Sequence, residues 1–249
     1  MARSDFRYQA TRFFDLSKGF DGIVAGEDRL GVLDDLQFFG TKLVLVEREH
    51  QHRGIPARQV GSVVVEELSD PVVSVPGADR VAALIDPICI LYDAVFSGSP
   101  HFWDDSVQHR QAMRQLVSES DFGLTIAEAE GALVGFAYGH TLRNNLWWRG
   151  FRDPVPEQVT REWPGRTFAV IDIAVDDHHR RRGIGTQLME LLLHDRSEER
   201  ATLAVVPAAV DAHVFYEQSG WQFVGRQDSP PDSGWLSPQF DIYVRALGK

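Results

Sequence analysis

The chain has 249 residues, enough to bury a substantial core as one large or two small domains. Asp and Glu total 36 against 25 Lys and Arg, and the resulting net charge of −11 argues against nucleic acid and favours a cationic or basic partner. The single cysteine, Cys89, excludes an internal disulfide. Because no apolar leader or membrane-length stretch is present, composition predicts a cytoplasmic protein without a membrane partner.

No recognisable motif lies in residues 1–75. The pattern of residues 30–39 indicates a possible helix, and residues 40–47, 60–68 and 72–75 are rich in β-branched side chains and are predicted strands. Residues 74–78, Ser-Val-Pro-Gly-Ala, form the best break in the pattern. We therefore expect an N-terminal extension of unknown role at residues 1–75 and a main domain at residues 76–249, with a soft boundary.

The main domain shows alternating helix and strand signals. Apolar spacing predicts a helix over residues 79–96, which Pro87 must kink or end, and a second helix over 106–119. Residues 122–128 and 132–141 form a predicted hairpin. Further strands are expected at 167–175, 201–206 and 239–245, and an amphipathic helix at about 186–194.

The most informative stretch joins the strand at 167–175 to the helix that follows it. Arg180, Gly183 and Gly185 are spaced as Arg-x-x-Gly-x-Gly, and the glycines allow backbone amides to approach a ligand closely. The N-terminus of the next helix points its N–H groups at the same place, and neighbouring arginines add positive charge. This arrangement predicts a pyrophosphate cradle. It lacks the Gly-Lys-Ser/Thr of a Walker loop and the third glycine of a dinucleotide fingerprint.

These residues resemble the acetyl-CoA signature of the GNAT superfamily of N-acetyltransferases. The downstream segment Ala-His-Val-Phe-Tyr-Glu-Gln-Ser-Gly-Trp, residues 212–221, is similar to that superfamily's Phe-Tyr helix and turn. The resemblance covers about residues 80–249. It implies an α/β (α+β) architecture, the GNAT fold, in which a strongly twisted mixed β-sheet is flanked by helices.

The resemblance also implies a reaction. Acetyl-CoA would be the co-substrate, and its acetyl group would pass by direct attack in a ternary complex to a primary amine of a small cationic molecule or peptide. In the superfamily the central strand splays from its neighbour, and backbone groups there hold pantetheine and the thioester carbonyl. The implied acetyl-CoA contacts are Ile173, Ala174, Val175, Arg180, Arg181, Arg182, Gly183, Ile184, Gly185 and Thr186.

Tyr216 occupies the position at which the superfamily places a tyrosine near the CoA sulfur. The reference pKa values of a thiol and a phenol, about 8.5 and 10, allow transfer of a proton to a departing thiolate. The resemblance therefore implies that Tyr216 is the general acid; the alternative is that Phe215 and Tyr216 only fill the core. The chain departs from many members at Ala209, where they carry an asparagine that contacts CoA.

Asp172 interrupts an otherwise apolar strand eight residues before Arg180. Related acetyltransferases often carry an acidic residue there, so Asp172 is the candidate base that takes a proton from the amine or holds its cation. A buried carboxylate satisfied by backbone groups or an arginine is an equal alternative.

Candidate residues for the acceptor pocket combine aromatic surface with negative charge, which suits an ammonium ion. They are Trp103, Asp104, Asp105, Trp147 and Trp148. The tryptophans could equally pack in the core or at the contact of a homodimer. No combination of cysteine, histidine and carboxylate predicts a metal site. A second class of function stays open, in which the domain binds acyl-CoA or serves regulation without catalysis.

Overall fold

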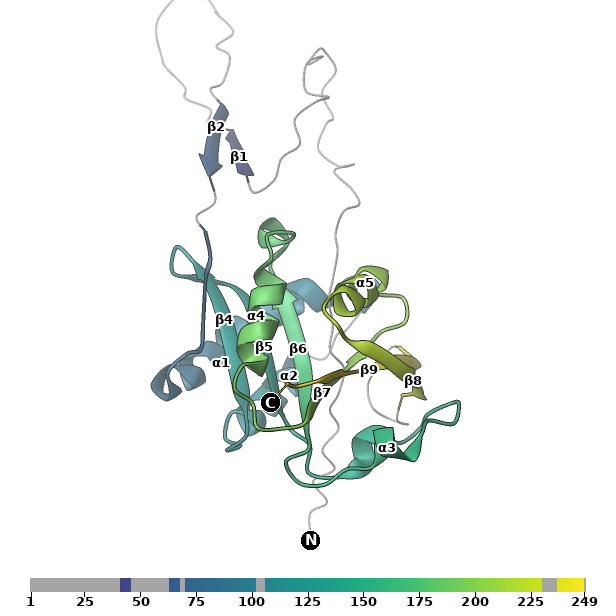
Figure 1. Cartoon of the computed structure of the whole chain (residues 1–249). Coiled ribbons are helices and arrows are strands. Elements are labelled where there is room, and N and C mark those ends of the chain that lie inside the picture. The colour runs from purple at the N-terminus through teal and green to yellow at the C-terminus, as the bar shows by residue number, and fades with distance from the viewer. Residues whose placement is uncertain (1–40, 46–62, 68–69, 102–105, 230–236, 249) are drawn as a thin grey trace, which may run out of the picture. The chain divides into compact units, whose positions relative to one another are not determined.

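The computed structural model describes residues 41–45, 63–67, 70–101, 106–229 and 237–248 (Figure 1). By its contacts the chain divides between Asp70 and Pro71, with residues 17–70 in the smaller unit. In that unit β1 (Thr41–Leu45) pairs antiparallel with β2 (Val63–Glu67). Strands were expected at both places. The helix expected at 30–39 lies outside the described residues.

The larger unit is built on a seven-stranded mixed sheet in the order β3-β4-β5-β6-β7-β9-β8. Neighbouring strands are antiparallel except β6 and β7, which are parallel. The order of elements confirms the expected GNAT fold. The strand bounds are β3 (Val72–Ser74), β4 (Gly123–Ala129), β5 (Ala132–Thr141), β6 (Thr167–Val175), β7 (Arg200–Val205), β8 (Gln222–Asp228) and β9 (Gln239–Ala246).

The strand at the start of this unit bears on the domain boundary. We placed the boundary near residue 76, whereas β3 pairs antiparallel with β4 and therefore extends the main sheet. β3 lies on the C-terminal side of the division at Asp70. The soft boundary reflects the expectation that the first strand of the fold comes from residues 60–75, and β3 is such a strand.

Five α-helices and two short 3-10 helices connect the described strands of the larger unit. The helices are α1 (Ala78–Phe96), α2 (Ser106–Leu116), α3 (Glu157–Thr160), α4 (Ile184–Leu193) and α5 (Val210–Gln218), with η1 (Asn145–Trp148) and η2 (Asp177–His179). Of the two expectations for Pro87, a kink or an end of the first helix, the end is excluded, since α1 continues through the proline. Ile88, Tyr92 and Phe96 beyond the proline are buried, and this burial offsets the hydrogen bond that proline cannot donate.

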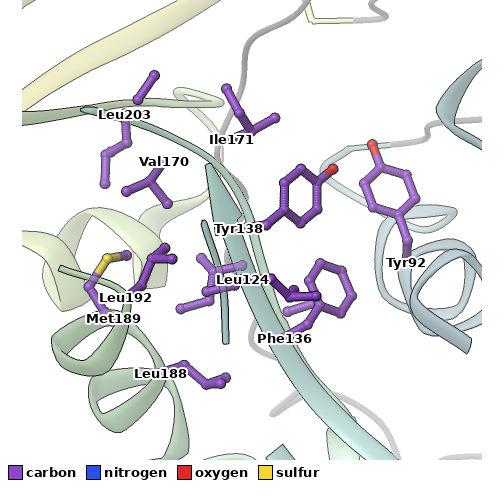
Figure 2. Packing of buried hydrophobic residues seen from close by; sticks show 14 of the residues in the cluster. Tyr92, Leu124, Phe136, Tyr138, Val170, Ile171, Leu188, Met189, Leu192 and Leu203 are labelled. Carbon is purple, nitrogen blue, oxygen red and sulfur yellow. The ribbon is translucent and has the colours of Figure 1, made fainter. Parts of the chain in front are cut away.

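Helices cover both faces of the sheet centre. Figure 2 shows Leu188, Met189 and Leu192 of α4 on one side, and Phe136 and Tyr138 directed toward α1 on the other. These side chains follow the helical and strand periodicities that the sequence displays. The core therefore holds β5 and β6 rigidly between two helical layers, and β6 leads directly into the glycine-rich turn.

Candidate active site

The parallel strands β6 and β7 separate at the centre of the sheet. Their register contains the pairs Thr167↔Arg200, Phe168↔Ala201 and Ala169↔Thr202, and no further pair joins the described residues of these two strands. β6 nevertheless continues to Val175 and β7 to Val205. The two strands therefore diverge toward their C-terminal ends, which is the splay that the sequence resemblance implied.

A register shift in the adjoining pair of strands accompanies this divergence. Tyr138 of β5 faces Asp172 of β6, whereas the next residue, Gly139, faces Val170, so Ile171 is the extra residue of a β-bulge. A Cβ atom on Gly139 would lie 2.2 Å from the carbonyl oxygen of Ala169. The glycine therefore permits the close approach of the two backbones beside the bulge.

The glycine-rich turn forms a cavity of about 280 Å³ at the end of β6. Gly183, the N-cap of α4, has a φ of 75°, a left-handed conformation that glycine adopts without steric cost. A Cβ atom on Gly183 would come no nearer than 4.0 Å to Gln187, so the glycine is required by conformation rather than by crowding. The lining comprises Val175, His179, Arg180, Arg181, Gly183, Ile184, Gly185 and Thr186, with Asp211, Val214, Phe215 and Gln218 from α5.

The three consecutive arginines have different environments. Arg180 is largely buried; its Nε donates to the carbonyl oxygen of Val175 at 3.0 Å, and its guanidinium pairs with Asp177 at 2.7 Å. Arg180 thus ties the turn to the end of β6. Arg181 is exposed at the cavity with a left-handed φ of 61°, while Arg182 is partly buried and is not among the lining residues. The positive charge, the αL turn and the N-terminus of α4 together fit a pyrophosphate.

The remaining predicted acetyl-CoA contacts lie on β6. Ile173 and Ala174 are 0% and 2% exposed, so their side chains belong to the core, and Val175 lines the cavity. Any contact that Ile173 or Ala174 makes with a ligand would have to come from the main chain, where β6 and β7 diverge.

Tyr216 is completely buried on α5, and its hydroxyl has no hydrogen-bond partner among the described residues. Burial and, next to it, the negative charge of Asp172 raise the pKa of Tyr216 well above its usual value. The hydroxyl therefore remains protonated, within electrostatic reach of Asp172. An unpartnered buried hydroxyl is uncommon and requires an explanation, and a ligand atom beside it would provide one.

Asp172 is 4% exposed on β6, and Tyr138 of β5 donates a hydrogen bond to its Oδ2. His109 Nε2 of α2 lies 4.0 Å from the same oxygen. A tyrosine hydroxyl, which the sequence did not indicate, thus donates to this carboxylate. Tyr138 lies within the apolar run of β5, and His109 shares the inner face of α2 with Met113 and Leu116. Neither residue therefore carries a functional signal in the sequence.

Trp147 and Trp148 are buried in η1, between β5 and β6. The indole Nε1 of Trp147 donates to Thr202 Oγ1 at 3.1 Å, and that of Trp148 donates to Glu162 Oε2 at 2.9 Å. Thr202 lies where β6 and β7 are still paired. The packing matches the core alternative that the sequence left open, and we therefore leave both tryptophans out of the acceptor site. Trp103, Asp104 and Asp105 lie outside the described residues.

Metal ions and membranes are two other possible partners for the part of the chain that the structure describes. No group of three or more histidine, cysteine, aspartate or glutamate side chains in these ranges is placed to hold a metal ion. No helix within the same ranges is both long and apolar enough to cross a membrane.

Comparison with known proteins agrees with this geometry. The model of the acetyltransferase (GNAT) family matches residues 89–221, more than half of the chain. The chain therefore belongs to the GNAT acetyltransferase family, and it is an enzyme of the acetyltransferase class. A comparison with curated protein sequences finds no match.

Among solved structures, an aminoglycoside 6′-acetyltransferase type Ii is 16% identical with a TM-score of 0.51, and the match covers 72% of this chain and 98% of that one. The Escherichia coli ribosomal-protein-S18-alanine N-acetyltransferase is 14% identical with a TM-score of 0.49, covering 72% and 95%. The yncA protein from Salmonella typhimurium, solved with its cofactor acetyl-CoA, is also 14% identical with a TM-score of 0.49, covering 73% and 96%. The similarity to the aminoglycoside acetyltransferase, with its TM-score of 0.51, supports the assignment of the fold.

Proposed function

We propose that this enzyme transfers the acetyl group of acetyl-CoA to a primary amine of a small cationic molecule or peptide, by direct attack while both substrates are bound. Holding both substrates in one cleft supplies much of the acceleration through proximity. The observation that carries the proposal is geometric: β6, which carries Asp172, diverges from β7 and ends at the cavity of the glycine-rich turn.

The turn after β6 is the proposed site of the CoA pyrophosphate. Gly183, Gly185, Thr186 and Arg181 line the cavity there, and the backbone amides of the first three and the guanidinium of Arg181 are the proposed contacts. Acetyl-CoA supplies the acetyl group as a thioester. The diverging backbone of β6, from Ile173 to Val175, is the proposed contact for the pantetheine and thioester portion.

Asp172 is the proposed proton acceptor and Tyr216 the proposed proton donor. An ammonium ion has no lone pair, so an amine acceptor must lose a proton to react, and a carboxylate can take it directly or through water. Neutralising Asp172 also removes the charge that, after burial, raises the pKa of Tyr216. Protonation of the base would therefore make the tyrosine a better donor to the leaving thiolate.

The acceptor is proposed to be cationic because the chain carries a net charge of −11 and because Asp172 lies within the central strand. The direct test is thiol release from acetyl-CoA with spermidine, kanamycin and an alanine-terminated peptide as acceptors. Wild-type enzyme should release thiol with at least one amine, and Asp172→Asn and Tyr216→Phe should each slow it. Acetylation of neutral or anionic acceptors alone would contradict the cationic-substrate proposal.

A further inference from the structure

A buried row of polar groups extends from Asp172 away from β6 and into the layer formed by α1 and α2. Tyr138 and Asp172 are direct cross-strand partners, so their side chains share one face of the sheet. Tyr138 is 1% exposed and donates its hydroxyl proton to Asp172 Oδ2. Burial and the charge of Asp172 raise the pKa of Tyr138 well above its usual value, which keeps the hydroxyl protonated as a donor.

His109 continues the row. Its Nε2 lies 3.1 Å from Tyr138 Oη, and the imidazole is 3% exposed. The one hydroxyl proton of Tyr138 is already directed to Asp172, so Oη can only accept from His109. With Asp172 ionised, the donor in this hydrogen bond is therefore His109 Nε2.

Tyr92 of α1 fixes the plane of the imidazole. Its ring stacks on that of His109 with centroids 3.5 Å apart and an interplanar angle of 17°. The two donors are thus carried by α2 and β5, and α1 supports the imidazole through the stacked Tyr92 ring. Tyr138 therefore lies next to the carboxylate of Asp172, and His109 lies behind Tyr138.

Among the described residues, titratable groups on several elements surround Asp172 and Tyr138. Tyr138 on β5, His109 on α2 and Tyr216 on α5 interact with Asp172, whereas Tyr92 and Cys89 on α1 act on Tyr138. Burial raises the pKa of the Cys89 thiol to about 11, so it is uncharged at neutral pH. A carboxylate in such surroundings is protonated unless donors compensate for its lost hydration.

We propose that His109 and Tyr138 are positioning residues, which orient Asp172 and keep it ionised for its role in acetyl transfer. The inference rests on the proposed role of Asp172 as the base. It requires no proton transfer along the row, because each proton stays on its donor and the two hydrogen bonds point toward the carboxylate. His109 Nε2, at 4.0 Å from Asp172 Oδ2, is too distant for a direct hydrogen bond, so its hydrogen bonding reaches the carboxylate through Tyr138.

The test follows the ionisation of Asp172 directly, without any substrate. Protein labelled with ¹³C at aspartate carboxyl carbons is titrated by NMR, and the Asp172 signal is identified by its loss in Asp172→Asn. In Tyr138→Phe the titration midpoint of Asp172 should rise by roughly one to two pH units. His109→Phe keeps a ring against Tyr92 but removes the donor, and it should raise the midpoint by a smaller amount.

A conservative replacement and two matched controls separate positioning from packing. His109→Gln places an amide donor near the former Nε2 and should restore the wild-type midpoint. Tyr92→Phe removes a neighbouring buried hydroxyl while keeping the stacked ring. His101→Phe alters a different buried histidine, which packs edge-on against Phe96 with centroids 5.3 Å apart. Both controls should leave the Asp172 midpoint where it is.

The double variant His109→Phe/Tyr138→Phe gives the decisive comparison. Because His109 acts through Tyr138, its midpoint should equal that of Tyr138→Phe alone. An unchanged midpoint in Tyr138→Phe, or additive shifts in the double variant, would overturn the proposal. If Tyr138→Phe does not fold, the contrast between His109→Phe and His109→Gln decides the same question.

The experiment that tests the row of His109 and Tyr138 is separate from the experiment that tests the proposed function. Thiol release with spermidine, kanamycin and the alanine-terminated peptide tests the role of Asp172 in acetyl transfer, whereas the carboxyl titration tests what holds Asp172. A shifted titration together with unchanged thiol release in Asp172→Asn would contradict the role of Asp172 as base and leave the row of His109 and Tyr138 standing.

Discussion

Replacing Tyr216 by phenylalanine should change stability and turnover in opposite directions. The hydroxyl is 0% exposed and has no partner among the described residues. Burying a polar group without a partner costs about 1–3 kcal/mol, so removing the oxygen and keeping the ring should stabilise the ligand-free enzyme by up to that amount. For a chain of this size that corresponds to a melting temperature higher by about 2–4 °C for each kcal/mol.

The same change should slow catalysis. Loss of a general acid typically costs about 10²–10⁴-fold in rate. Affinity for acetyl-CoA should hardly change, because the proposed pyrophosphate contacts lie at the turn after β6 and do not involve the tyrosine hydroxyl. The variant would then be a more stable protein and a poorer enzyme, as expected where a site is built at the expense of stability.

The measurement combines thermal unfolding without ligand, calorimetry with acetyl-CoA and single-turnover thiol release. Tyr243→Phe is the matched control, since that buried hydroxyl lies 2.8 Å from His213 Nδ1 and 3.3 Å from Glu217 Oε1. Losing its hydrogen bonds should destabilise the protein by about 1 kcal/mol and leave turnover intact. A destabilised Tyr216→Phe, or one with wild-type turnover when chemistry is rate-limiting, would refute the reasoning.

Four further changes test other parts of the molecule. Gly185→Asp should abolish acetyl-CoA binding because it adds bulk and negative charge at the cradle, and unchanged affinity in calorimetry would contradict the site. Asp172→Asn should depress thiol release most at neutral pH and recover partly at alkaline pH, where solvent deprotonates the amine; a uniform loss with a lower melting temperature would indicate a structural aspartate instead. Gly139→Ala should destabilise the fold by at least about 1–3 kcal/mol in urea unfolding, because its Cβ would meet a backbone carbonyl at 2.2 Å. Burial lowers the pKa of His140, so the unfolded chain binds more protons and stability should fall as pH drops below about 6.5; His140→Leu should flatten that dependence in melting curves.

Local patterns predicted most regular elements of the larger unit. The apolar strand at 167–175 agrees with β6 residue for residue, and the expected hairpin agrees with β4 and β5 around the turn at Glu130 and Gly131. These predictions succeed because strand and helix periodicities are imposed by burial on one face, and the sequence displays them directly. The sequence left open whether Pro87 kinks or ends the first helix, and the helix continues because burial of the turns beyond the proline outweighs its local preference.

Other features depend on contacts between distant segments. Whether Trp147 faces an acceptor or the core depends on Thr202, 55 residues away, whose hydroxyl accepts the indole hydrogen bond. β3 joins the main sheet only through β4, so its assignment could not come from its own three residues. An edge strand has no periodicity that reveals its partner.

The sequence by itself determined the family and the glycine-rich turn, because both are encoded in contiguous residues with fixed backbone requirements, such as the left-handed Gly183. Only the tertiary structure decided the surroundings of Asp172. The tyrosine beside it comes from a neighbouring strand, and the histidine behind that tyrosine comes from a helix far along the chain. The ionisation of a buried carboxylate depends on which donors reach it in three dimensions, and no local pattern records that.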